Sequence, residues 1–340
     1  MTWGRADFVT LGTWGRTDFV TLSERTFFMG SFLNSISSVL IILLMTAAGF
    51  IFGAKKWMIA EHKTFMEKFL MYYAIPCLNI GALSRYLSPE TLEGSWKILT
   101  VSCLGMFFCV LIAALIAYLL RLPRNRAGVF IGMGGFSNVL FVGYPMCREL
   151  FGEQAVVYVM LYFVCNSVLI FVVCYAVFAW FSGTERKLSL SRIVKIFINP
   201  PVLTAIIGIL LVVFDISLPR PITALVDYVG ATVSPLALLY CGFIIYEAGI
   251  KNISMDRGMA VMPVMRFVIS PLVGLALCSI FGIPPLATSV VIIEMAMPVM
   301  TILVVMAKEW EADVQYAATG IVLSTLSCFV VIPILMLFFQ

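Results

Sequence analysis

Long apolar runs separated by short polar connections dominate this chain from residue 32 onward. We identify ten of them, over residues 32–54, 64–84, 96–120, 127–150, 155–181, 199–217, 225–248, 260–281, 286–308 and 313–338. Each run holds about 18 to 28 residues, and a helix needs about 20 apolar residues to cross roughly 30 Å of hydrocarbon. The pattern therefore predicts an all-α integral membrane protein with ten transmembrane helices.

Basic residues are distributed unevenly between the connections, and this predicts the orientation. With the N-terminus outside, most lysines and arginines fall in the inner connections, and the outer connections receive only Arg85, Lys97, Arg148 and Arg220. Cytoplasmic loops carry an excess of Lys and Arg, so this orientation agrees with the positive-inside rule. We expect a multi-pass protein of the plasma membrane with both termini outside.

Prolines recur at matching places in the two halves of the chain. Pro76 in the second span matches Pro235 in the seventh, and Pro145 in the fourth matches Pro298 in the ninth. Five spans in each half force the second half to enter the membrane upside down, which is the plan of many secondary transporters. We predict a first repeat over residues 29–182, a cytoplasmic linker over 183–198, and an inverted second repeat over 199–340.

Pro145 and Pro298 predict that helices four and nine are broken near mid-membrane. A break leaves backbone N–H and C=O groups without partners, which is tolerated only beside protein or a polar cavity. At each break a half-helix begins, and its free N–H groups and positive dipole end favour negative charge. Two such ends can face one carboxylate. Pro76, Pro235, Pro263 and Pro271 are interpreted as kinks or packing.

The first 28 residues stand apart from the predicted spans. Residues 2–11 recur at 13–22 with a single change, Ala6 to Thr17, and the segment lacks the apolar core of a signal peptide. We interpret residues 1–28 as a non-native or disordered leader. A genuine peripheral arm is the alternative.

Composition agrees with a membrane protein and argues against catalysis. Hydrophobic residues make up 62% of the chain, charged residues 12%, and the mean hydropathy is +1.05. The nine cysteines fall in or against apolar spans and lack disulfide or metal-ligand spacing, so we interpret them as small hydrophobes. The single histidine, His62, has no nucleophile or carboxylate pair beside it. We expect no enzyme activity, cofactor, metal or nucleic-acid partner.

Pro145 and Pro298, together with the polar residues near them, are the candidate substrate-binding residues. Asn138 lies seven residues before Pro145, on the same helical face, where its amide either contacts substrate or caps the interrupted backbone. Asn166 either contacts substrate or bridges helices by hydrogen bonding. Tyr144 and Thr301 flank the breaks, and their hydroxyl groups form hydrogen bonds either with the substrate or with the backbone.

Two of the charged residues inside the predicted spans are candidates for a role in transport. Glu294 lies four residues before Pro298, where inserting a charged carboxylate into the membrane costs about 2.5–3.5 kcal/mol. It either couples transport to a proton or cation, or accepts a hydrogen bond from a backbone N–H at the broken helix. Arg266 in span 8 is interpreted as an interfacial anchor or a partner for Glu247, with attraction of anions as the alternative.

Small-residue spacing predicts close helix packing at two places. Gly49 and Gly53, and likewise Gly128 and Gly132, are four residues apart, which lets helices approach closely. The glycine-rich run that includes Gly134 lacks a preceding strand and a phosphate-binding lysine, which argues against a nucleotide site.

Several short motifs in this order resemble those of the auxin efflux carriers, a family that includes plant PIN proteins and many bacterial permeases. The matching pieces are Ser137-Asn138 with Gly143-Tyr144-Pro145, Asn199-Pro200-Pro201 with Gly208, and Ala296-Met297-Pro298 with Ala307-Lys308-Glu309-Trp310. The resemblance covers about residues 30–338. The chain departs from the plant members because it has no long hydrophilic loop between its halves, which suits a compact bacterial carrier of the inner membrane.

The resemblance implies a fold and a function. Helices 4 and 9 cross at their breaks, spans 1, 2, 6 and 7 form a scaffold that is often dimeric, and spans 3–5 and 8–10 form a mobile unit. The implied function is secondary transport of a small organic anion by an elevator-like motion. The alternative is a sodium- or proton-coupled symporter resembling bile-acid carriers, with Glu294 lining the cation route, and a channel or receptor is a further class. We expect the anion, a coupling Na⁺ or H⁺, the lipid bilayer and a homodimer as partners.

Overall fold

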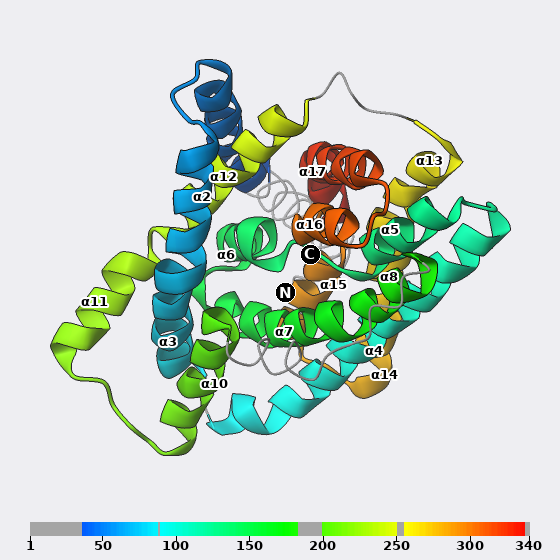
Figure 1. Cartoon of the computed structure of the whole chain (residues 1–340). Helices are drawn as coiled ribbons and strands as arrows, with labels where there is room; N and C mark the ends of the chain where they lie inside the picture. The colour runs from blue at the N-terminus through cyan, green and yellow to red at the C-terminus, as the bar shows by residue number, and fades with distance from the viewer. Residues whose placement is uncertain (1–35, 88, 183–198, 250–254, 337–340) are drawn as a thin grey trace, which may run out of the picture.

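The computed structural model describes residues 36–87, 89–182, 199–249 and 255–336, and these residues are predominantly helical (Figure 1). The predicted leader (1–28) and linker (183–198) lie outside the described residues. The helices are Ile36–Ala54, α2 Ala60–Phe69, α3 Ile75–Tyr86, α4 Pro89–Leu119, α5 Arg124–Gly135, α6 Tyr144–Phe151, α7 Val156–Leu169, α8 Tyr175–Ser182, α10 Pro200–Val213, α11 Arg220–Gly230, α12 Val233–Ala248, α13 Arg257–Val264, α14 Ser270–Phe281, α15 Pro285–Met295, α16 Ile302–Glu309 and α17 Val314–Met336.

Within the part of the chain that the structure describes, six continuous helical runs are long and apolar enough to cross a membrane. They are Ile36–Ala54, Gly94–Leu119, Glu153–Phe181, Arg220–Ala248, Arg257–Phe281 and Val314–Met336. The other predicted spans correspond to shorter, interrupted or more polar helices, such as α10 and α15. The prediction of an all-α, multi-pass membrane protein is therefore confirmed at this level.

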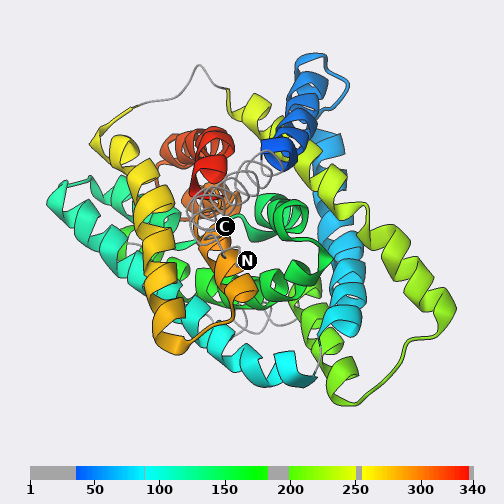
Figure 2. The ribbon, with the colours of Figure 1, turned by 180° about the vertical axis from the view of Figure 1, so that it is seen from behind.

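The described helices gather in two groups that lie side by side (Figures 1 and 2). In one group α3 packs along α10 and α11, and α12 lies at the end of α11. In the other group α4 packs against α5, α7 and α14, and α15 packs against α14. Figure 1 shows α6 and α7 between the groups, so the segments that adjoin both groups come from the end of the first half of the chain.

Glycines let the first described helix lie directly against α12. A Cβ atom on Gly49 would come 2.1 Å from the Leu239 carbonyl oxygen, and one on Gly242 would come 1.9 Å from the Thr46 carbonyl oxygen. Only a residue without a side chain fits at so close an approach. The predicted packing role of Gly49 is thereby confirmed, and Gly242 is its counterpart on the facing helix.

Prolines inside three helical runs follow π-helical turns instead of breaking the chain. A proline ring clashes with the carbonyl four residues earlier, and a π-helical turn, whose hydrogen bonds span five residues, relieves that clash by widening the helix locally. Pro76 follows Leu70–Ala74, Pro145 follows Val139–Gly143, and Pro271 follows Met265–Ile269, each by two residues.

The predicted break at Pro145 is wrong, because the chain is helical through this residue. The Gly143 N–H donates to the Asn138 carbonyl across five residues, at 3.0 Å, and α6 continues from Tyr144. Pro145 has no N–H to donate to the Phe141 carbonyl, which instead accepts a hydrogen bond from the Cys241 thiol at 3.8 Å. The interruption lies earlier, between Gly135 and Val139. By contrast, Pro298 does lie in the second interruption, between α15 and α16.

Candidate functional site

The two interrupted segments cross and hydrogen-bond to each other. Ser137 and Val299 form an antiparallel bridge, and the Asn138 N–H donates to the Pro298 carbonyl oxygen at 2.8 Å. Non-helical backbone at membrane depth must find partners within the protein, and each segment here supplies the other. The crossing of two broken helices, implied by the resemblance to auxin efflux carriers, is present with its first break moved toward the N-terminus.

Arg266 holds the crossing together from one side. Its side chain is buried, its Nε donates to the Met297 carbonyl oxygen at 2.6 Å, its Nη1 donates to the Gly134 carbonyl oxygen at 3.1 Å, and its Nη2 donates to the Ser137 hydroxyl. The last carbonyls of α5 have no partner within the helix and carry its negative dipole end, so a guanidinium with five donors fits there.

The expected pairing of Arg266 with Glu247 is wrong, because Glu247 forms an ion pair with Lys63. Arg266 begins inside an apolar run, and its long side chain reaches the protein interior instead of the membrane surface. The sequence signal for the role of Arg266 is that a charged side chain inside an apolar run is energetically costly and so needs partners. A charge placed there is usually buried in the helix bundle and paired with backbone or counter-charge.

Asn166 in α7 completes the crossing from another side. Its Oδ1 accepts from the Ser137 N–H at 3.3 Å, and its Nδ2 donates to the Ser137 carbonyl at 3.2 Å. The amide thus replaces both hydrogen bonds that helical backbone would have made at Ser137. On the other segment, the Ser324 hydroxyl accepts from the Val299 N–H at 3.0 Å. The helix-bridging interpretation of Asn166 is supported by these contacts.

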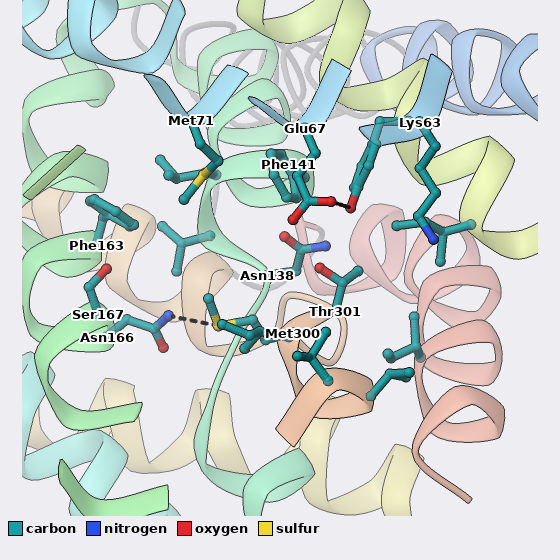
Figure 3. Close-up of a pocket in the computed structure, with 18 of the residues that line it drawn as sticks. Lys63, Glu67, Met71, Asn138, Phe141, Phe163, Asn166, Ser167, Met300 and Thr301 are labelled. Atoms are coloured by element: carbon teal, nitrogen blue, oxygen red, sulfur yellow. Dashed lines mark hydrogen bonds between the residues drawn. The ribbon is translucent and has the colours of Figure 1, made fainter. Parts of the chain in front are cut away.

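A cavity of about 350 Å³ ends at this crossing (Figure 3). Asn138 and Thr301, which immediately precede the two helical segments that start at the crossing, both line it, and so does Asn166. Neither Asn138 nor Thr301 caps its helix with its side chain. In the second segment, the Leu303 and Val304 N–H groups donate to the Met300 and Thr301 carbonyl oxygens, so each segment presents its positive dipole end and only its remaining first-turn N–H groups. The cavity therefore ends at two positive helix ends.

The rest of the cavity wall is largely apolar, with charged groups along α2 and α12. Phe141, Phe163 and Met300 project into the cavity beside the amides (Figure 3). Lys63 and Glu247, which pair with each other, are both partly exposed, so the cavity reaches the surface at this end.

Sequence reasoning missed the α2 and α12 residues of the wall. Lys63, Glu67 and Met71 recur every fourth residue of one helical run and all line the cavity, a spacing that places them on one face. Tyr240 from α12 also lines it and donates to Glu67 Oε2 at 3.2 Å. The sequence did offer a signal for this wall. Polar residues spaced four apart continue into the start of an apolar span and so share one helical face.

Tyr144 does not join the other candidates in this cavity. It lines a second cavity of about 270 Å³, together with Arg85, Arg148, Glu153 and Asp227. Arg85 lies at the opposite end of the α2–α3 run from Lys63, so the second cavity adjoins the other end of that run. Pro145 is buried and lines neither cavity. Pro298 is buried at the crossing, where its carbonyl accepts the Asn138 N–H.

Glu294 is fully buried and lies outside both cavity walls. Its Oε1 accepts from the Cys147 thiol at 3.5 Å, and its Oε2 has no hydrogen-bond partner. A Cβ atom on Gly143 would come 2.2 Å from Oε2, so the carboxyl group lies directly against the π-helical turn that contains Gly143. The turn separates this carboxyl group from the cavity at the crossing.

Comparison with known proteins gives one family and several relatives. A family model described as "Membrane transport protein" matches residues 34–336. An uncharacterized transporter of Methanocaldococcus jannaschii is 25% identical over 311 residues, which is 87% of this chain and 96% of that protein. One of Methanothermobacter thermautotrophicus is 24% identical over 309 residues, with 89% and 98% covered. A "Putative malonate transporter" of Rhizobium meliloti is 23% identical over 273 residues, with 78% and 83% covered.

Proposed function

Because this chain belongs to the membrane transport protein family, as its likeness to auxin efflux carriers indicated, we propose that it is a secondary transporter of a small organic anion. The observation that carries this proposal is the cavity that ends where two helical segments begin, at Asn138 and Thr301. Paired helix N-termini offer free N–H groups and positive dipole ends to a single carboxylate without a buried cation.

The substrate that we propose is a carboxylate or weak acid with an apolar portion. A relative named as a malonate transporter supports the carboxylate, and the phenylalanines of the cavity wall support an apolar portion. Asn138 and Thr301 are the proposed polar contacts, Asn166 fixes the crossing at the edge of the site, and Pro298 shapes it. Tyr144 and Pro145 act on the other side of the π-helical turn.

We propose that ten helices form two inverted five-helix repeats in the plasma membrane, with both termini outside. Contacts between distant connections support this topology. Arg126 pairs with Asp256 at 3.0 Å and with Asp313 at 2.8 Å, and all three belong to connections predicted to be inside. Arg85, in a connection predicted to be outside, also pairs with Asp227, which lies near the end of the seventh span predicted to face outside. Residues assigned to the same membrane face therefore meet.

An elevator-type motion is the mechanism that we propose. The helix group that includes α4, α5, α13, α14 and α17 would move as one body past the group that includes α3, α10 and α11, and the latter would form the homodimer scaffold. The Arg126 cluster supports a rigid body, because it ties the beginnings of α5, α13 and α17 together. The π-helical turn against α12 is the main contact between the groups.

A sodium- or proton-coupled symporter of the bile-acid carrier type is the second candidate. The observation that favours it is Glu294, whose buried carboxyl group has one oxygen without a hydrogen-bond partner. Such a group is a candidate to bind a proton or cation when the crossing rearranges. A channel or receptor is a less favoured class, because the described cavity ends at the crossing.

Counterflow in liposomes tests the class of protein. Purified full-length protein in vesicles loaded with malonate, succinate or benzoate should exchange the same labelled anion with saturable kinetics, and empty vesicles should not. Single-channel currents without exchange would reject a carrier. Repeating uptake with and without sodium, and with and without a pH gradient, separates the symporter from an uncoupled carrier.

A further inference from the structure

Glu67 lies on the cavity side of α2 without a cationic partner. Lys63, one turn earlier on the same face, is already paired with Glu247. Among the described residues, no lysine, arginine or histidine forms an ion pair with Glu67, and its carboxyl group accepts a hydrogen bond from the Tyr240 hydroxyl at 3.2 Å. Figure 3 shows the Glu67 carboxyl group projecting into the same space as the Asn138 amide.

The charges of the cavity wall do not balance when Glu67 is ionised. The other titratable side chains of the described wall are Lys63, Tyr240 and Glu247, and His62 and Lys68 of the same helix are not part of it. Lys63 offsets Glu247, which leaves the carboxylate of Glu67 as an excess negative charge. An anion at the crossing would share the cavity with that charge, and like charges in the same cavity repel each other.

We propose that Glu67 is a proton-binding residue whose ionisation sets the affinity of this cavity for an organic anion. The inference rests on the proposed function. A proton from the water at the cavity mouth adds to a carboxylate oxygen of Glu67, the excess charge disappears, and the neutral carboxyl group gains an O–H donor that can face the anion. No bond within the anion changes. Anion and proton binding are then coupled, and each strengthens the other by the same factor.

The two other glutamates near the crossing fit this role less well. Glu247 is ionised beside Lys63 and loses that ion pair if it is protonated. Glu294 is sealed behind the π-helical turn and lines neither described cavity. Glu67 is exposed and faces the cavity, so water and protons can reach it in this conformation.

Calorimetric binding of benzoate and of malonate to the full-length protein tests this role. Titrations in two buffers with different heats of ionisation report protons taken up per anion bound. Wild-type protein should take up protons as it binds the anion, and benzoate affinity should rise about tenfold as the pH falls from about 7.5 to about 5.5. Glu67→Gln should take up no proton and should bind with an affinity that does not change over this range.

Glu61→Gln is the matched control, because Glu61 lies on α2 but does not line the cavity; it should behave as the wild type. Proton uptake that persists in Glu67→Gln would overturn the inference and leave the proposed function intact, provided that this variant still exchanges anions in vesicles. Wild-type protein that exchanges anions without taking up protons would overturn it equally. Wild-type protein that exchanges none of the three carboxylates would reject the proposed function and the inference together.

Discussion

The backbone N–H of Asn138 donates to the carbonyl oxygen of Pro298 at 2.8 Å, and this contact joins two segments that are 160 residues apart in the chain. It forms because neither segment is helical at this point, so each has backbone groups to satisfy. The same interruption allows a new helical segment to begin beside each residue and to direct its positive end at one cavity.

Asn138→Ala should lower carboxylate exchange at least about tenfold while the protein still folds. The amide lines the cavity beside the first turn of a helical segment, and loss of one well-placed hydrogen bond to a charged group costs roughly 1.5–3 kcal/mol. Counterflow rates, normalised to folded protein by size-exclusion chromatography, measure the effect. Asn125→Ala is the control, because Asn125 is exposed and contributes only its carbonyl, to the Asp313 N–H. Undiminished exchange in Asn138→Ala would remove this residue from the site.

Arg266→Lys should destabilise the protein by about 1–3 kcal/mol for each buried acceptor that loses its donor. A lysine has a single nitrogen and cannot serve the Met297 and Gly134 carbonyls and the Ser137 hydroxyl together, so buried acceptors lose their donors. Thermal unfolding in detergent should occur roughly 5–10 °C lower than in the wild type. Arg257→Lys, at an exposed position at the start of α13, should leave the unfolding temperature unchanged. Equal stability of the two variants would contradict the role of Arg266 at the crossing.

Gly242→Ala should destabilise the contact between α12 and the helix Ile36–Ala54. The new Cβ would come 1.9 Å from the Thr46 carbonyl oxygen and 2.8 Å from the Phe50 nitrogen, so the helices must separate. Overpacking of this kind costs about 1–3 kcal/mol. Gly94→Ala is the control, since a Cβ atom at that position would meet no other atom within 4 Å and alanine favours a helix. Unfolding temperatures decide the matter, and a Gly242→Ala variant as stable as Gly94→Ala would refute the close approach.

Glu294→Gln should leave any dependence of uptake on a sodium or proton gradient unchanged. The carboxyl group lines neither cavity, and one of its oxygens has no partner, so a neutral amide of the same shape replaces it at little cost. Uptake into vesicles with imposed gradients is the measurement. Loss of gradient dependence, with exchange at equilibrium preserved, would favour the symporter of the bile-acid carrier type instead.

Much of the architecture could be predicted from the sequence, because hydrophobic length and basic-residue bias act locally along the chain. The presence of two breaks was predictable from the prolines inside apolar runs, whereas the crossing of the broken helices was implied by the resemblance to auxin efflux carriers. The position of the first break was not, because the π-helical turn Val139–Gly143 absorbs Pro145. That turn also changes the helical phase, so Asn138 lines the cavity and Pro145 does not, although α-helical spacing placed the two on one face.

The charged groups were harder to place from the sequence. Arg266 has acceptors at Gly134 and Met297, which are far away in the chain, so its burial depends on the tertiary crossing. Glu67 lies near the end of a predicted span and looks like an ordinary surface residue until α12 brings Tyr240 beside it. Such pairings follow from three-dimensional packing and leave little trace in local periodicity.

A structure of the protein with a carboxylate bound tests the central claim most directly. Cryo-electron microscopy in the presence of whichever of malonate, succinate and benzoate exchanges fastest should show the carboxylate between Asn138 and Thr301, within about 3 Å of first-turn N–H groups of both helical segments. A carboxylate bound away from the crossing, or unbroken helices at these two places, would contradict the account.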